Sequence, residues 1–171
     1  GYGQLLDLRG GGDHPFSLAL AVNTQPAPTA SETYRLTLTG WHDPDTPTNV
    51  VQTVTFALGD PFRWVSLGFS RSDTTFRLYR DGLMILEQDL PGFALCEFDA
   101  SLAAGFIGAA HGVEAKRDRE IAEITCWNKT LDTAEFAELA LHRPSTTASG
   151  LTAYFAFEDG RDLNVKSGSN L

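Results

Sequence analysis

An acidic loop beside a tryptophan is the part of the chain whose residue types best suit chemistry. Trp41 ends a β-type run, and Asp43, Asp45 and Asn49 follow it with prolines between them. Ca²⁺ takes about six to eight oxygen ligands, so Asp43, Asp45 and Asn49 form a candidate calcium site. A sugar ring stacks its C–H face on an aromatic ring while polar groups bind its hydroxyls. The alternative is a plain hairpin loop, because Asp, Pro and Asn also favour turns.

Two further groups are weaker candidates for ligand binding. Tyr79, with Arg77 shortly before it, offers a second aromatic ring beside a polar group. The acidic residues of 158–162 form a rival calcium cluster, which also lacks the regular spacing of an EF-hand. Trp41 has a structural alternative as well, because a tryptophan at the end of an alternating strand can belong to the core.

Nothing in the chain predicts catalysis. Glycoside hydrolysis needs two carboxylates that flank the scissile bond, and Glu120 and Glu123 are the nearest approach to such a pair. They are an odd distance apart, so on a strand they point to opposite faces. The histidines are scattered, without a Gly-x-Ser-x-Gly motif for a hydrolase or a His-x-x-x-His pair for zinc. We expect a non-catalytic chain unless carboxylates distant in sequence meet in a groove.

Length and composition suit a single domain, and the missing initiator Met at Gly1 suggests a mature product or one excised from a larger protein. The 171 residues, 42% of them hydrophobic, are enough for one core. No apolar run approaches the roughly 18 residues of a membrane-spanning helix. The net charge of -9 disfavours nucleic-acid phosphates and anionic lipid, which attract basic surfaces. We expect no nucleic-acid partner and no membrane insertion.

Short β-type runs with turn residues between them predict an antiparallel β-sandwich. Apolar and polar residues alternate in Tyr34–Thr39 and in Val50–Phe56, so each of these strands should bury one face. The expected strands lie near Gln4–Leu8, Phe16–Val22, Tyr34–Trp41, Val50–Leu58, Arg63–Ser70, Thr75–Arg80, Leu83–Gln88, Gly105–Ala109, Glu120–Trp127 and Leu151–Phe157.

The pair Asp81-Gly82 is the clearest local signal. Asp-Gly between two β-rich runs favours a tight two-residue hairpin whose central residues have positive φ. In that register Tyr79 opposes Met84, and both faces of the hairpin carry apolar side chains. One face should meet the core, and the other should be partly covered. The expected faces are Phe76, Leu78 and Ile85 on one side, and Arg77, Tyr79, Met84 and Leu86 on the other.

One short α-helix is expected near Asp132–His142. Asp132 can cap its N-terminus, and Glu135 three residues later completes a capping box. Leu131 before the cap and Phe136 at the fourth helical position form the matching hydrophobic staple. A proline shortly afterwards ends the helix.

Two phrases of the chain resemble the laminin-G-like and pentraxin-like branch of the concanavalin A-like lectin/glucanase superfamily. The first is Trp64-Val-Ser-Leu-Gly-Phe-Ser, followed by Phe76-Arg-Leu-Tyr-Arg-Asp-Gly82. The second is Ile107-Gly108, followed by Glu120-Ile-Ala-Glu-Ile-Thr-Cys-Trp-Asn-Lys-Thr-Leu131. The resemblance, which covers roughly Phe16–Gly160, implies a concanavalin A-like jelly roll with the short helix at its edge. It also implies that Trp64 and Trp127 lie in or near the core.

The chain departs from the pattern of the resembled family in the second phrase. Ala122 stands where the family often has Asp, which weakens any site built on that residue. Cys126 stands where the family usually has a buried Ile or Val, which favours a small buried thiol. A disulfide between Cys96 and Cys126 is the alternative, because such bridges form in exported proteins.

The resemblance implies a recognition module of an extracellular or cell-surface protein, because members of this fold bind glycans or proteins. Glycan binding is the leading interpretation, with calcium as a candidate cofactor. The alternative is a structural or protein-interaction domain without a small ligand. An exposed apolar patch on the face of Tyr79, Met84 and Leu86 would support that alternative. The candidate ligand-binding residues are Trp41, Asp43, Asp45, Asn49, Arg77 and Tyr79.

Overall fold

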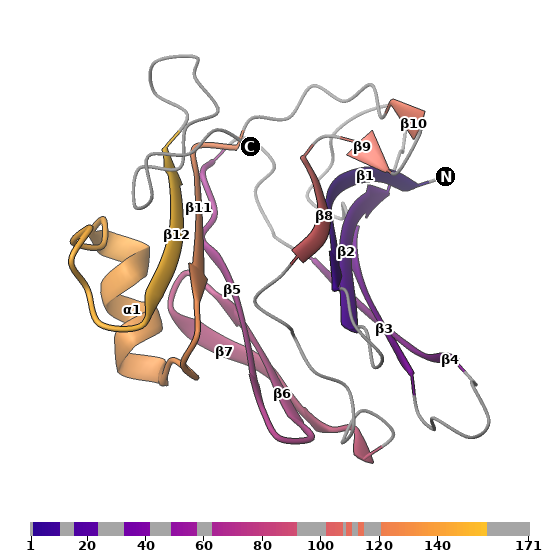
Figure 1. Ribbon diagram of the computed structural model, residues 1–171, viewed down its shortest axis with the longest axis horizontal. Coiled ribbons are helices and arrows are strands. Elements are labelled where there is room, and N and C mark those ends of the chain that lie inside the picture. The colour runs from indigo at the N-terminus through magenta and orange to yellow at the C-terminus, as the bar shows by residue number, and fades with distance from the viewer. Residues whose placement is uncertain are drawn as a thin grey trace. The chain divides into compact units, whose positions relative to one another are not determined.

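The computed structural model describes residues 2–10, 16–23, 33–41, 49–57, 63–91, 102–107, 109–110, 113–114 and 121–156. These residues form antiparallel β-sheets with one short α-helix (Figure 1), as the sequence predicted. They belong to two compact units, each assembled from two stretches of chain. The first unit is Gly1–Val65 with Asp89–Asp118, and the second is Ser66–Gln88 with Arg119–Leu171. In the described ranges, no helix has the length and apolar character needed to cross a membrane.

The first unit is built around a five-stranded antiparallel sheet (Figure 1). Four strands follow one another along the chain and pair in sequence order, while the fifth comes from much later in the chain and pairs with β1. A short pair of strands, β9 and β10, completes the described part. The bounds are β1 Tyr2–Gly10, β2 Phe16–Asn23, β3 Thr33–Trp41, β4 Asn49–Ala57, β8 Leu102–Ile107, β9 Ala109–Ala110 and β10 Val113–Glu114.

Alternation along β3 and β4 buries one face of this sheet, as their sequences predicted. Tyr34, Leu36 and Leu38 are buried, whereas the residues between them are only half-buried. Leu38 lies opposite Leu18 of β2, and Tyr34 lies opposite Phe56 of β4 with its ring stacked at 6.0 Å between centroids. Cross-strand apolar pairs of this kind fix the register, because a slip by one residue would expose every buried side chain.

The second unit contains a three-stranded sheet, a two-stranded sheet and the helix (Figure 1). Both sheets are antiparallel in their described pairings. The bounds are β5 Leu67–Ser72, β6 Thr75–Arg80, β7 Leu83–Asp89, β11 Glu123–Trp127, β12 Leu151–Ala156 and α1 Thr133–Leu141. The strand expected from Arg63 begins only at Leu67.

Trp64 does not lie in the core, contrary to the expectation for the two tryptophans of the resembled phrases. Its side chain is 63% exposed and it precedes β5 without belonging to a strand. Trp127 is half-buried and packs against the buried cluster of the second unit. Only Trp127 therefore has the predicted core role.

The Asp81-Gly82 hairpin turn is confirmed. Asp81 has φ +52° and Gly82 has φ +77°, and they are the two residues between β6 and β7. Asp81 also connects the turn by hydrogen bonds to Ser66, the residue before β5. Its backbone N–H donates to the Ser66 carbonyl at 2.8 Å, and its Oδ1 accepts from the Ser66 N–H at 3.1 Å. A two-residue connection makes Tyr79 and Met84 cross-strand neighbours on one face.

Helix α1 begins as the sequence predicted. Asp132 is the N-cap, and its Oδ1 accepts from the Glu135 N–H at 2.9 Å. The Asp132 N–H in turn donates to the Glu135 Oε2 at 3.0 Å, which completes the capping box. Two backbone donors that a helix N-terminus leaves unpaired are thereby satisfied. The helix ends at His142, which has extended backbone angles.

Phe136 anchors α1 to the three-stranded sheet. Its ring stacks on Tyr79 of β6 with 4.0 Å between centroids. Gly68 is the register partner of Tyr79 on β5, and a Cβ atom there would overlap the Phe136 ring. Leu131, the residue of the predicted staple, is buried in the same cluster. The missing side chain of Gly68 therefore creates the space that the ring of Phe136 fills.

The turn between β6 and β7 is held against the same helix. A Cβ atom on Gly82 would lie 2.5 Å from the Cα atom of Ala137. Gly82 also has positive φ. Both this backbone conformation and the close approach of the helix favour glycine over a residue with a side chain.

We predict that Gly68→Ala lowers the free energy of unfolding by about 1–3 kcal/mol, because the new methyl group overpacks against Phe136. Chemical denaturation of both proteins measures the difference. Ser72→Ala is the matched control, since Ser72 is an exposed residue on the same strand, and its effect should stay within about 0.5 kcal/mol. Adding Phe136→Leu to Gly68→Ala should recover part of the loss. An unchanged stability of Gly68→Ala would contradict the packing described here.

Candidate functional site

The end of the β3–β4 hairpin brings two predicted ligand-binding residues together. The register runs without interruption from Thr33 opposite Ala57 to Trp41 opposite Asn49, so the last two are Cα partners. The connection that joins them, residues 42–48, contains Asp43 and Asp45 and lies outside the described residues. The two strands thus deliver an aromatic and an amide residue to the two ends of the acidic loop.

Neither calcium cluster named from the sequence can be followed in full. Asp43, Asp45 and the rival cluster at 158–162 lie outside the described residues. Among the described residues, no group of three or more His, Cys, Asp or Glu side chains could hold a metal ion.

Tyr79 does not offer its ring to a ligand. The side chain is 1% exposed and is covered by Phe136 of α1. Its assignment as a sugar-stacking residue is therefore wrong in this structure, and its role is to form the core beneath the helix. Alternation along β6 places Arg77 and Tyr79 on one face, but only the placement of α1 decides which part of that face is covered.

Arg77 remains partly accessible but already has a partner. Its Nε donates to the Glu87 Oε2 at 2.7 Å, and the two side chains are 28% and 49% exposed. Arg77 lies opposite Ser70 in the register of β5 and β6. An ion pair of this exposure contributes little to stability.

Ser70 is a buried hydroxyl without a described partner. The residue is 6% exposed, and its Oγ has no hydrogen bond within the described part of the chain. A buried hydroxyl that makes no hydrogen bond costs about 1–3 kcal/mol. The sequence showed no sign of this feature, because a serine on a strand normally faces solvent.

Glu123, from the pair considered for glycoside hydrolysis, is engaged in an ion pair. Its Oε1 lies 2.5 Å from the Nε of Arg143, which follows α1. Glu120 lies outside the described residues.

Cys126 is a free, half-buried cysteine on β11. Burial raises the pKa of its thiol, because the uncharged form is favoured away from water. A raised pKa makes the thiol a poor nucleophile at neutral pH. Cys96, its proposed partner, lies outside the described residues.

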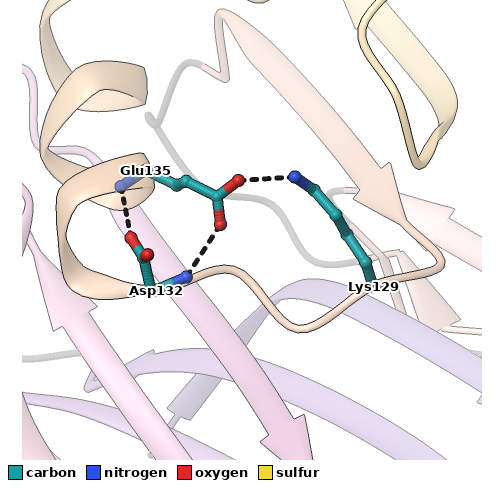
Figure 2. Close-up of polar contacts among 3 residues, drawn as sticks. All are labelled: Lys129, Asp132 and Glu135. Carbon is teal, nitrogen blue, oxygen red and sulfur yellow. Dashed lines mark hydrogen bonds and ion pairs between the residues drawn. The ribbon is translucent and has the colours of Figure 1, made fainter.

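Lys129, Asp132 and Glu135 form a charged network at the start of α1, which Figure 2 shows. The Lys129 Nζ lies 2.5 Å from the Glu135 Oε1, and the same carboxylate closes the capping box through its other oxygen. The hydrogen bond from Lys129 and that from the Asp132 backbone hold the pKa of Glu135 below its usual range.

Lys129 also lies close to the Gly150 backbone and to the Trp127 ring. A Cβ atom on Gly150 would lie 2.8 Å from the Lys129 Cγ, and the Lys129 ammonium lies 5.8 Å from the centre of the Trp127 ring. The Asn128 N–H donates to the Gly150 carbonyl at 2.9 Å. These residues of the resembled phrase therefore connect β11, α1 and the loop before β12.

Exposed apolar side chains gather at two places in the second unit. Leu83 and Met84 begin β7 and are 69% and 46% exposed, and Leu141 at the end of α1 is 77% exposed. The apolar patch expected at Tyr79, Met84 and Leu86 is thus only partly present, because Tyr79 is buried and Leu86 is half-buried. Sequence reasoning missed the exposure of Leu141.

No protein-family model, curated protein or solved structure matches this chain.

We predict that Glu135→Gln lowers the melting temperature at pH 7 and that the gap to wild type closes as the pH falls. Folding lowers the pKa of Glu135, so its contribution is present above the ordinary carboxyl range and is lost as the pH drops through the lowered pKa. Thermal melts of both proteins from pH 7 downward measure this. Glu138→Gln on the same helix is the control and should change the melting temperature less, because the contact of Glu138 with the His142 Nε2 is longer, at 3.9 Å. A gap that is constant with pH would contradict the role of the charge.

We also predict that Ser70→Ala leaves the free energy of unfolding unchanged or raises it, because the buried hydroxyl lacks a partner. The control Thr130→Val removes a hydroxyl that donates to the Arg71 carbonyl at 2.9 Å. That variant should lose about 0.5–1.5 kcal/mol. Chemical denaturation measures both, and a loss above about 1 kcal/mol for Ser70→Ala would show that the hydroxyl is hydrogen-bonded.

Proposed function

We propose that the chain is a non-catalytic carbohydrate-recognition module of the concanavalin A-like jelly-roll type. The antiparallel sheets with one short helix and the two phrases of the resembled family support the fold. The observation that carries the function is the register of β3 and β4, in which Trp41 and Asn49 are partners at the end of the hairpin. Asp43 and Asp45 follow Trp41 in the connection between them.

The residue types at this end of the hairpin suit a sugar. An indole ring provides the apolar platform on which a pyranose face stacks. Amide and carboxylate groups provide directional hydrogen bonds to the hydroxyls. Asp43, Asp45 and Asn49 would supply oxygen ligands to Ca²⁺, which binds hard oxygen donors and could hold the loop or the sugar hydroxyls.

The cellular setting belongs to the same proposal. A glycan-binding module acts where glycans are displayed, so we place the protein outside the cell or on its surface, as one domain among others of a larger polypeptide. Its partners are a glycan or a protein surface. A second candidate function, protein interaction without a small ligand, is favoured by the exposure of Leu83, Met84 and Leu141.

A glycan-array screen of the folded chain, run with calcium and with a chelator, tests the carbohydrate proposal. We expect specific binding that falls at least about tenfold, or roughly 1.4 kcal/mol, in Trp41→Ala. The pair Asp43→Ala with Asp45→Ala should also weaken binding. Thr53→Ala is the matched control, because Thr53 is exposed on β4 of the same hairpin, and it should bind like wild type.

The outcomes separate the parts of the proposal. Binding lost on chelation assigns calcium to the acidic loop, whereas binding that persists retains the sugar and removes calcium. If the folded wild-type chain binds no glycan, or if both loop variants bind like wild type, the carbohydrate site is wrong.

A further inference from the structure

Strand β4 forms one edge of the five-stranded sheet and lacks the features that usually protect such an edge. Among the described residues its only strand partner is β3 (Figure 1). It is nine residues long, Asn49–Ala57, and contains no charged residue, proline or glycine. Its register with β3 runs without a bulge. Proteins normally blunt an edge with such residues, with bulges or with short strands, because free backbone groups pair with other chains.

The opposite edge of the same sheet has this protection. β8 is six residues long and contains Gly105. Its register with β1 shifts between Arg9 and Gly10. Irregular pairing and glycine both weaken an edge as a template for a further strand. The unprotected edge is therefore a property of β4 and not of the whole sheet.

Apolar burial in this sheet is incomplete at β4. Leu36 on β3 is 4% exposed, whereas its register partner Val54 on β4 is half-buried. Tyr34 and its partner Phe56 differ in the same way, at 7% exposed and half-buried. Thr53, which alternates with Val54, is exposed on the other face. One further strand with apolar residues on the Val54 side would complete the burial of this row.

The distribution of charge indicates that a second copy of this chain can supply that strand. The chain has 22 acidic residues and a net charge of -9, so repulsion generally opposes the approach of two copies. β3 and β4 together contain no Asp or Glu, and Arg35 is their only charged residue. Two copies can therefore meet along this edge without placing carboxylates of these strands opposite each other.

The sequence of β4 is also complementary to itself in the register that pairs all nine residues. Two antiparallel copies centred on Thr53 are related by a two-fold axis perpendicular to the sheet. Each position then meets one that is an even number of residues away, so the buried faces stay on the same side. Thr53 opposes its own copy, and Phe56 opposes Val50. Thr–Thr and aromatic–β-branched pairs both stabilise antiparallel strands.

We propose that β4 pairs with β4 of a second copy, antiparallel and centred on Thr53, to form a symmetric dimer with one sheet running through both copies. The pairing uses the β4 edge of each copy, so assembly stops at the dimer. The inference goes beyond the proposed carbohydrate recognition, and its test uses no sugar.

Sedimentation of the full chain over a range of concentrations tests the pairing. We expect wild type to dimerise reversibly, and more strongly at high salt, because salt screens the repulsion between two acidic copies. Thr53→Lys places like charges opposite each other at the axis and should weaken the dimer at least tenfold. Ser149→Lys makes the same change of charge at an exposed position of the second unit and should dimerise like wild type.

A mixture of two charged variants tests the register itself. Thr53→Glu should be as poor a dimer as Thr53→Lys. In an equal mixture of the two, opposite charges meet at the axis, so dimers should form at concentrations where each variant alone is monomeric. Melting temperatures close to wild type show that both variants are folded, and a misfolded variant would not regain pairing on mixing.

Three results would overturn the proposal. The first is a wild-type chain that stays monomeric up to about 1 mM at both salt concentrations, where even a weak specific dimer forms. The second is a Thr53→Lys variant that dimerises like wild type, or a mixture of the lysine and glutamate variants that stays monomeric. The third is growth of the wild-type chain into larger assemblies, because a two-fold pairing of β4 is closed.

Discussion

The stacking of Phe136 on Tyr79 is the contact on which the second unit depends. Gly68 is the cross-strand partner of Tyr79, and the ring of Phe136 reaches Tyr79 only because Gly68 has no side chain. Truncating a buried phenylalanine to alanine typically costs about 3–5 kcal/mol, a large share of the stability of a small protein. Without this contact Tyr79 and Leu131 would lose their cover, and Gly82 would lose the helix that it touches.

The same helix performs different tasks on its different sides. Its buried side fixes the sheet through Phe136, and its N-terminus is closed by the capping box and by Lys129 (Figure 2). Its outer side ends in an apolar residue, Leu141, which these contacts leave exposed. The packing and capping of the helix therefore do not depend on Leu141.

Local chemistry explains which parts of the fold could be predicted from the sequence. The Asp81-Gly82 turn and the capping box of Asp132 and Glu135 depend on residues within a few positions of one another. The alternation of β3 and β4 likewise located the Trp41–Asn49 end of the hairpin, and with it part of the candidate carbohydrate site. The register of such a hairpin follows from its own two strands.

Contacts between distant segments explain what could not be predicted. Arg77 and Tyr79 lie on the same face of β6. Tyr79 is buried because α1, some fifty positions later in the chain, packs over it. The family phrase suggested a core position for Trp64, yet β5 begins after it and leaves its side chain exposed. Leu141 is apolar, and its exposure depends on where the helix packs rather than on its neighbours along the chain.

The order of segments along the chain constrains how the protein can be made and divided. β1 pairs with β8, so Leu6 and Ile107 are neighbours although the β5–β7 segment of the other unit is synthesised between them. During synthesis the five-stranded sheet can be completed only after β5, β6 and β7 have been made, because its strand β8 follows them in the chain. A continuous fragment that ends before Ser66 would lack β8, and one that begins at Arg119 would carry α1 without Gly68 and Tyr79. Neither unit can therefore be expressed whole by a simple truncation.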